Sequence, residues 1–180
     1  MTDKINIFWF RRDLRLNDNN GLFNALKSGR KVQPIFIFDK EILDKLPKDD
    51  ARVSFIHKEI ENIHKQLEKI ESTIDVYYGK PIDIFKSLSE KHEIDIVFTN
   101  HDYEPYSIKR DLEINQFLET KNIHFKTFKD QVIFERNEIV KKDGTPYKVY
   151  TPYSKKWLET FHLRGIDNFP SEELQQNFVK

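Results

Sequence analysis

The sequence contains no cysteine, and this absence excludes disulfide bonds, thiolate metal sites and a cysteine nucleophile. Glycine is also scarce, with five residues in 180, and neither GxGxxG nor GxxxxGK[ST] occurs after the first apolar segment. Without such a glycine loop, no run of backbone amides can lie against a pyrophosphate or a triphosphate. The sequence therefore argues against a dinucleotide-dependent dehydrogenase and against a P-loop nucleotidase.

Long apolar runs and an excess of either charge are missing too. No stretch approaches the ~20 apolar residues of a membrane span, and the amino-terminal MTDKINIF lacks the pattern of a signal peptide. Basic and acidic residues balance, with 30 of each, so no global field attracts the chain to nucleic acid or to a membrane. We expect a cytoplasmic, monomeric protein without a membrane partner, in which any DNA contact is local or lies outside the chain.

Candidate catalytic groups are few. No Gly-x-Ser-x-Gly elbow occurs, and His57 and His64 are seven residues apart rather than at the spacing of a metal-binding pair. The best remaining candidate for a divalent cation or a hydrogen-bonded ligand is the group His101, Asp102 and Glu104. We predict neither a resident metal nor catalytic residues in this chain.

The sequence does contain a regular alternation of strand and helix signals. Five short segments rich in β-branched and aromatic residues are predicted to be strands: residues 5–10, 32–38, 74–78, 94–100 and 123–128. Strands separated by helices are typical of a parallel sheet. We predict an α/β fold, a Rossmann-like five-stranded parallel sheet with helices on both faces, followed by an irregular connector and a short helix.

The uncharged segment INIFWF predicts a central first strand, buried on both faces. A charge cluster follows it: Arg11, Arg12, Asp13 and Arg15. In the simplest interpretation Arg12 and Asp13 pair and the other arginines are solvated. Ligands of open α/β sheets bind at the carboxyl ends of the strands, so the cluster is also a candidate binding loop. Asp18 is predicted to cap the helix that comes next.

Three further helices have a recognisable apolar side. The clearest spans residues 53–70, where apolar residues step by three and four. The next two begin at Pro81 and Pro105, which suit a first helical turn. The second of these should carry Ile108, Leu112, Phe117 and Leu118 inward, while Lys109, Arg110, Asp111 and Glu113 form a solvated or paired face.

After residue 128 the pattern changes. Residues 131–140 and 147–150 read as short extended pieces around a turn at Asp143 and Gly144, and Pro152 is predicted to start a helix. We therefore divide the chain into an α/β domain, residues 1–130, and a connector, residues 131–180.

The order WFRRDLRLNDN resembles the first strand and loop of DNA photolyases and cryptochromes. Three further stretches resemble the same family in the same order: ARV at 51–53, NHDYEPYSIKRD at 100–111 and GTPYKVYTPYSKKW at 144–157. The resemblance implies the amino-terminal α/β domain of that family, which holds a light-harvesting chromophore, the antenna. The connector would then lead toward a helical FAD-binding domain that this chain does not contain.

The resemblance also implies a function. In photolyases the antenna passes absorbed energy to FAD in the helical domain, which splits pyrimidine dimers flipped out of damaged DNA. The expected function is therefore that of the light-harvesting-chromophore domain of a deoxyribodipyrimidine photolyase, with DNA contacted through the missing domain. A cryptochrome domain and a stand-alone nucleotide- or flavin-binding module are alternatives. The GTPYKVYTPYSKKW segment argues against the second, because a free-standing module has no use for such a connector.

Carried over by resemblance, the antenna contacts fall at the carboxyl ends of the first, second and fourth strands. The implied cofactor-binding residues are Phe10, Arg11, Phe36, Phe38, Asp39, Arg52, Asp102 and Glu104. Aromatic walls would stack on a planar ring, while arginine and carboxylates would hold its polar edge and tail. Alternatively, Arg52 and Asp102 pair across the sheet end. Folate-binding members have Asn-Glu where this chain has Tyr106 and Ser107, which favours FMN or 8-hydroxy-5-deazaflavin over methenyltetrahydrofolate.

Overall fold

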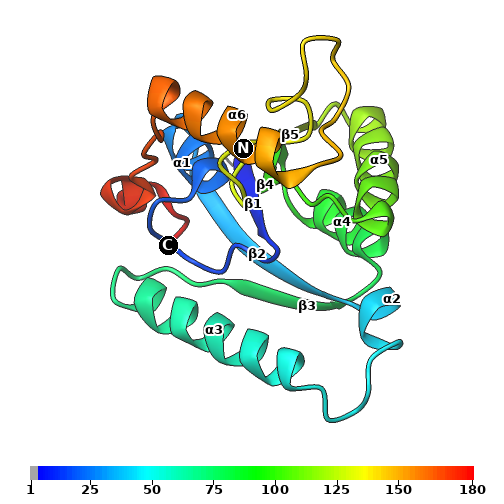
Figure 1. The fold of residues 1–180 in the computed structure, drawn as a ribbon. Coiled ribbons are helices and arrows are strands. Elements are labelled where there is room, and N and C mark those ends of the chain that lie inside the picture. The colour runs from blue at the N-terminus through cyan, green and yellow to red at the C-terminus, as the bar shows by residue number, and fades with distance from the viewer. Residues whose placement is uncertain (1–3) are drawn as a thin grey trace.

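The computed structural model describes residues 4–180, and a sheet of five parallel strands lies at its centre (Figure 1). The strands are β1 (Ile5–Phe10), β2 (Val32–Asp39), β3 (Asp75–Gly79), β4 (Ile94–Asn100) and β5 (His124–Phe128). Their order is β3-β2-β1-β4-β5, so the first strand is central, as its uncharged sequence predicted. The strand order reverses between β1 and β4, and this reversal places a ligand crevice outside the carboxyl ends of the central strands.

Helices cover both faces of the sheet. On one face lie α1 (Asn20–Lys27) and α3 (Ala51–Glu68), and on the other lie α4 (Pro81–Lys91) and α5 (Pro105–Thr120). Because successive side chains of a strand point to opposite faces, β1 contributes Phe8 and Phe10 to the first core and Ile7 and Trp9 to the second. The predicted α/β architecture is therefore confirmed.

The apolar stripe of α3 packs on the sheet as predicted. Ile60, Ile63 and Leu67 are buried, and Asp50 caps the helix by accepting a hydrogen bond from the backbone of Arg52. Both α4 and α5 begin at the predicted prolines, where a missing N–H costs nothing. The short helix α2 (Lys40–Leu43) links β2 to α3.

The prediction for the inward side of α5 was partly wrong. Ile108 and Leu112 are 44% and 58% exposed, and the buried residues are Ser107, Arg110, Ile114 and Leu118. The Arg110 guanidinium lies 4.8 Å from the centre of the Trp9 ring and 3.6 Å from Asp39. A charged residue therefore takes an inward position because the sheet offers it an aromatic face and a carboxylate.

The predicted cap of α1 was wrong by one residue. Asn19 is the N-cap, and its side chain accepts a hydrogen bond from the backbone N–H of Leu22 at 3.1 Å. Asp18 has a positive φ of 46° and instead accepts from the backbone N–H of Phe169 at 3.0 Å. The carboxylate thus ties the start of α1 to the distant end of the connector.

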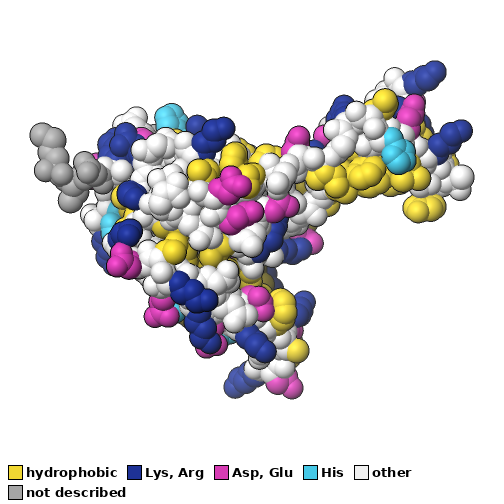
Figure 2. All heavy atoms as spheres, turned by 90° about the vertical axis from the view of Figure 1, so that its left-hand side faces the viewer, with side chains coloured by type: hydrophobic (Ala, Val, Ile, Leu, Met, Phe, Trp, Pro, Cys, Tyr) yellow, Lys and Arg dark blue, Asp and Glu magenta, His cyan; other side chains and the backbone are white. Residues whose placement is uncertain are grey.

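No strand lies between residues 129 and 149, so the extended pieces predicted there were wrong, while the turn at Asp143 and Gly144 is present. Aromatic packing replaces strand pairing, because Phe134 packs edge-to-face on Trp157 at 5.3 Å between ring centres. Helix α6 (Tyr150–Arg164) begins before the predicted Pro152. Figure 2 shows an arm that projects from the body with hydrophobic side chains along one side. The exposed apolar residues of α6 are Tyr150, Tyr153, Leu158 and Leu163.

The last ten residues fold back onto the sheet. The 3₁₀ helix η1 (Ser171–Asn177) packs beside α1, and Phe178, 1% exposed, enters the first core (Figure 1). Val179 donates a backbone hydrogen bond to Val32 at 3.0 Å, and Ser72 Oγ donates to the carbonyl of Val179 at 2.6 Å. The connector is thus held to the α/β domain at both ends. Within residues 4–180, no helix is long and apolar enough to cross a membrane.

Candidate functional site

A cavity of about 620 Å³ opens at the carboxyl ends of β1 and β2, beside the loop after β4. This volume falls within the range of roughly 300–1,000 Å³ that is typical of small-molecule sites. All eight residues that the resemblance implied line this one cavity: Phe10, Arg11, Phe36, Phe38, Asp39, Arg52, Asp102 and Glu104. The structure therefore brings them together, whereas their role in binding a chromophore remains a prediction.

Two sides of the cavity are apolar. Phe36 and Phe38 pack edge-to-face at the end of β2, with ring centres 5.0 Å apart. Aliphatic side chains from α2, α3 and the loop between them complete the wall: Ile42, Leu43, Leu46, Val53 and Ile56. Sequence analysis missed these aliphatic residues, because their position opposite β2 depends on the path of the loop between α2 and α3. Such walls suit the faces of a planar aromatic ring.

The floor of the cavity is formed by the buried ring of Trp9, against which two guanidinium groups lie. Arg11 and Arg110 lie 4.2 and 4.8 Å from the centre of the Trp9 ring. Arg11 also forms a bidentate ion pair with Asp111, with both N···O distances at 2.8 Å. Burial and the neighbouring charge of Arg110 lower the pKa of Arg11, although Asp111 opposes this shift. Arg11 is therefore a structural part of the floor.

Asp39 joins three elements around the cavity. Its carboxylate caps α2 by accepting from the backbone of Glu41 at 3.0 Å, and it accepts from the Tyr106 hydroxyl at 2.7 Å. Arg110 approaches the same carboxylate at 3.6 Å. Burial and the hydrogen bond to Asp39 raise the pKa of Tyr106. Tyr106 thus belongs to the cavity wall, where sequence analysis had noted it only as a departure from the folate-binding pattern.

The rim carries ion pairs that differ from both pairings proposed from the sequence. Arg12 lies 3.8 Å from Asp102 and 3.7 Å from Glu104, not against Asp13. Arg52 pairs with Asp50 at 2.6 Å, not with Asp102. Hydrogen bonds from Arg52 lower the pKa of Asp50 to about 2.

Asp102 is held by its own loop and by the first turn of α5. Its carboxylate accepts from Ser107 Oγ at 2.8 Å and from the backbone N–H of Glu104 at 3.2 Å. Burial alone would raise the pKa of Asp102, but these hydrogen bonds and the charges of Arg12 and Arg110 outweigh it and lower the pKa. Asp102 therefore presents a charged carboxylate to the cavity.

The metal candidate that combined His101, Asp102 and Glu104 was wrong. His101 Nδ1 lies 2.6 Å from Glu135 and Nε2 lies 2.9 Å from Thr127 Oγ1, and the residue does not line the cavity. Across the part of the chain that the structure describes, no three His, Asp or Glu side chains are grouped as metal ligands. The β4 loop therefore supplies the cavity with carboxylates alone.

The cavity offers both apolar and charged surface to a small molecule. Its lining combines aromatic and aliphatic walls with charged side chains, most of which are in ion pairs. A planar aromatic cofactor fits this set of residues, since ring faces can contact the apolar walls and polar edges can reach the rim. The fold and the cavity together define a doubly wound α/β domain with a cavity of small-molecule size at its switch point.

One protein family matches most of the chain. The DNA photolyase family model matches residues 6–174, and the chain belongs to this family. Curated deoxyribodipyrimidine photo-lyases from Synechococcus sp. and Alkalihalophilus pseudofirmus are 30% and 32% identical to it over 84% and 88% of this chain. These matches cover 31% and 33% of the relatives, so the chain spans about a third of their length.

Solved structures support the same assignment. The class III photolyase of Agrobacterium tumefaciens matches all of this chain and 36% of its own, with a TM-score of 0.80 and 26% identity. The photolyase of Sulfolobus tokodaii, solved with two FAD molecules and described as implying a novel light-harvesting cofactor, matches 73% of this chain and 32% of its own, with a TM-score of 0.66 and 34% identity. A Synechocystis cryptochrome, at 18% identity and a TM-score of 0.79, shares the fold. The described residues thus form the α/β domain of the photolyase fold.

Proposed function

We propose that this chain is the light-harvesting-chromophore domain of a deoxyribodipyrimidine photolyase and that its cavity binds a flavin-type antenna. The observation that carries the proposal is the meeting of eight separately implied residues in one cavity of about 620 Å³. Membership of the photolyase family supports it. The cytoplasmic location and the monomeric state predicted from the sequence remain predictions.

The flavin class is favoured over a folate for two reasons. The S. tokodaii relative, 34% identical, was solved with a second FAD and a light-harvesting role was inferred. In this chain Tyr106, with its hydroxyl on Asp39, stands where folate-binding members have an asparagine. The candidates are therefore FMN, FAD and 8-hydroxy-5-deazaflavin, ahead of methenyltetrahydrofolate.

Repair itself would need the part of the relatives that this chain does not match. The antenna, when bound, absorbs light and passes excitation to FAD in the helical domain, which acts on damaged DNA. The chain's own aromatic and aliphatic residues in the cavity wall would contact the antenna ring and reduce its exposure to water. The exposed apolar side of α6 supports the presence of a second domain, because monomeric surfaces rarely leave such patches uncovered.

A titration with matched variants tests the proposal. FMN, FAD, 8-hydroxy-5-deazaflavin and methenyltetrahydrofolate are titrated separately, and binding is followed by fluorescence. Ile42→Asp places a charge on the cavity wall and should weaken flavin binding at least tenfold, since burying an unpaired carboxylate against the ring is unfavourable. Ile108→Asp is the matched control, because Ile108 lies outside the cavity and is 44% exposed against 42% for Ile42. Flavin binding that is equal in both variants, or binding of the folate alone, would contradict the proposal.

A further inference from the structure

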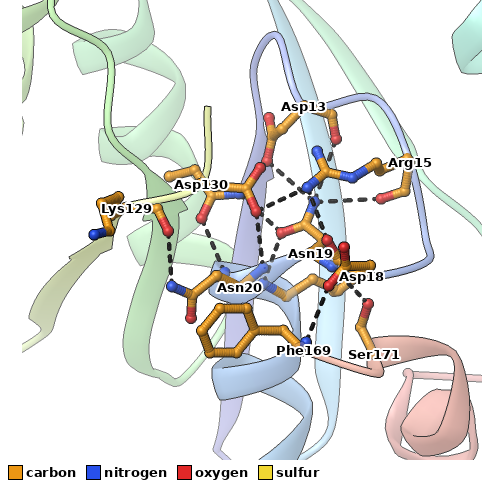
Figure 3. Close-up of polar contacts among 12 residues, drawn as sticks. Asp13, Arg15, Asp18, Asn19, Asn20, Lys129, Asp130, Phe169 and Ser171 are labelled. Atoms are coloured by element: carbon orange, nitrogen blue, oxygen red, sulfur yellow. Dashed lines mark hydrogen bonds and ion pairs between the residues drawn. The ribbon is translucent and has the colours of Figure 1, made fainter. Parts of the chain in front are cut away.

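The sheet has two edge strands, β3 and β5, and the second of them is protected against pairing with another chain (Figure 1). The exposed side chains of β5 are polar, namely His124, Lys126 and Thr127, and a lysine on an edge strand is a common form of such protection. The chain that follows β5 is tied to α1, where Asn20 Nδ2 donates to the carbonyl of Lys129 at 2.7 Å (Figure 3). The β5 edge is therefore an unfavourable template for a partner strand.

The β3 edge has an apolar surface instead. Val76 and Tyr78 are 48% and 61% exposed, and the strand contains neither lysine nor proline. Its pairing with β2 is regular from Asp75 to Gly79, without a bulge that would turn the edge away. Within residues 4–180, the backbone of this segment makes no hydrogen bond outside the sheet. One row of N–H and C=O groups is therefore open to another strand.

A groove of about 310 Å³ lies between β3 and α3. Its apolar lining is formed by Phe38, Ile60, Ile74 and Val76. Alternate side chains of a strand face the same side of the sheet, so a strand added to β3 would direct every second side chain toward α3. In sites that bind a peptide by strand addition, main-chain pairing supplies affinity and such a groove supplies selectivity.

The helix side of the groove is acidic while its histidines are uncharged. Glu61 lines the groove, and Glu68 follows two turns later on the same side of α3. The two carboxylates are 55% and 60% exposed, and they pair with His57 and His64 at 3.4 and 3.5 Å. These imidazoles neutralise the carboxylates only when they are protonated. Since no described lysine or arginine lines the groove, a basic segment complements it better than an acidic one.

We propose that the groove between α3 and β3 binds an extended segment of a partner protein, which adds a strand to the sheet and places apolar and basic side chains over the groove. The apolar side chains would contact Ile74 and Val76, and a lysine or arginine would face Glu61. Of the groove lining, only Phe38 also lines the cavity described above. The groove is therefore a second site, and its use does not depend on a flavin in the cavity.

Fluorescence anisotropy with two labelled peptides tests the charge selectivity. In TVTKTVTKT the valines and lysines share one face of an extended chain, and in TVTETVTET glutamate replaces lysine. The lysine peptide should bind at least about tenfold tighter than the glutamate peptide, and added salt should reduce this ratio. Glu61→Gln should reduce the ratio by at least about threefold, since the variant loses an exposed carboxylate of the groove.

A second experiment tests strand addition. Val76→Lys should weaken binding of the lysine peptide at least about tenfold, because it places a like charge on the edge. Leu112→Lys on α5 is the matched control, since it adds the same charge at a side chain that is 58% exposed and lies outside the groove. This control should change the affinity by less than about twofold. Bound peptide should also slow hydrogen exchange at the backbone amides of β3.

Several results would overturn the proposal. One is equal affinity of the two peptides for the unaltered chain, and another is the absence of binding at about 1 mM peptide. A third is binding that neither Val76→Lys nor hydrogen exchange in β3 detects, because the peptide would then lie elsewhere. A fourth is a dimer of this chain that Val76→Lys dissociates and the lysine peptide does not, because the occupant of the edge would then be a second copy.

Discussion

Arg11 and Asp111 form a bidentate ion pair that joins the carboxyl end of β1 to α5. Their side chains are 5% and 17% exposed, so both charges are largely removed from water. Such a pair offsets the cost of its own desolvation only while both partners are present. The pair therefore makes the cavity floor depend on a contact between residues one hundred positions apart.

Asp111→Asn tests this dependence. The variant leaves Arg11 buried beside Arg110 without its carboxylate partner, so we expect the free energy of unfolding to fall by about 3–5 kcal/mol in urea denaturation. Glu159→Ala, which breaks the exposed pair with Lys156 on α6, should cost less than about 1 kcal/mol. If the free energy of unfolding decreased equally in the two variants, Arg11 would have to form another ion pair when Asp111 is replaced.

Gly21→Ala should destabilise the protein, although alanine is usually the better residue within a helix. A Cβ at this position would lie 2.5 Å from Asn100 Oδ1 and 3.0 Å from the Phe8 ring. Overpacking of this kind costs about 1–3 kcal/mol and would disturb the capping of α1. Thermal unfolding measures the effect, with Lys27→Ala on the exposed end of α1 as the control. A raised melting temperature for the Gly21 variant would show that Asn100 moves aside freely.

Phe178→Ala should cost about 3–5 kcal/mol, because it removes a ring that is 1% exposed in the first core. Leu163→Ala on α6 is the control, since that side chain is 79% exposed and its removal should change stability by less than about 0.5 kcal/mol. Urea denaturation followed by tryptophan fluorescence compares them. Should the two variants prove equally stable, the carboxyl-terminal segment would be dispensable for the fold.

Because of Tyr106, we expect the free energy of unfolding to decrease at alkaline pH. Its pKa is raised by burial and by the hydrogen bond to Asp39, so the folded state favours the neutral phenol. The associated stability is fully present below the unfolded tyrosine pKa of about 10 and is lost as the pH rises above it. Tyr106→Phe should flatten this alkaline loss and lower stability at neutral pH by about 1–3 kcal/mol, since Asp39 loses a donor. Tyr78→Phe, at a side chain 61% exposed on β3, should leave neutral-pH stability unchanged.

The chain alone should bind duplex DNA weakly. Its formal net charge is zero, and the locally basic stretch, residues 141–164, has Lys156 paired with Glu159 and Arg164 paired with Glu138. Few phosphates can be neutralised by such a surface, so affinity should be weak and strongly dependent on salt. Fluorescence anisotropy with a labelled oligonucleotide measures it. Sub-micromolar binding at physiological salt would contradict this expectation.

The strands were predictable because their apolar residues form short, contiguous runs. The central place of the first strand was also predictable, since its uncharged sequence indicates burial on both faces, whereas the order of the other strands comes from the structure. The inward face of α5 was not predictable, because Ile108 and Leu112 have the apolar character of core residues while Arg110 does not. Only the placement of Trp9 and Asp39 makes burial of that arginine favourable.

The site was predictable only in outline. Resemblance carried residues such as Phe38 and Arg52 to one edge of the sheet, and the structure brings them into one cavity. The partners of the charges were not predictable, because Asp50 for Arg52 and Asp111 for Arg11 depend on side-chain directions at the ends of helices. The wall formed by α2 and α3 depends on a loop path that no periodicity encodes.

The backbone hydrogen bond from Val179 to Val32 brings the two ends of the described chain together. Asn6 pairs with the same Val32, so both ends lie at the start of β2, whereas the cavity opens where β2 finishes. The eight residues of β2 separate the two places by roughly 26 Å at 3.3 Å per residue. A dye or a surface tether attached near either end would leave the cavity mouth free. Excitation transfer between such a dye and a bound flavin would then report occupancy of the cavity across a fixed distance.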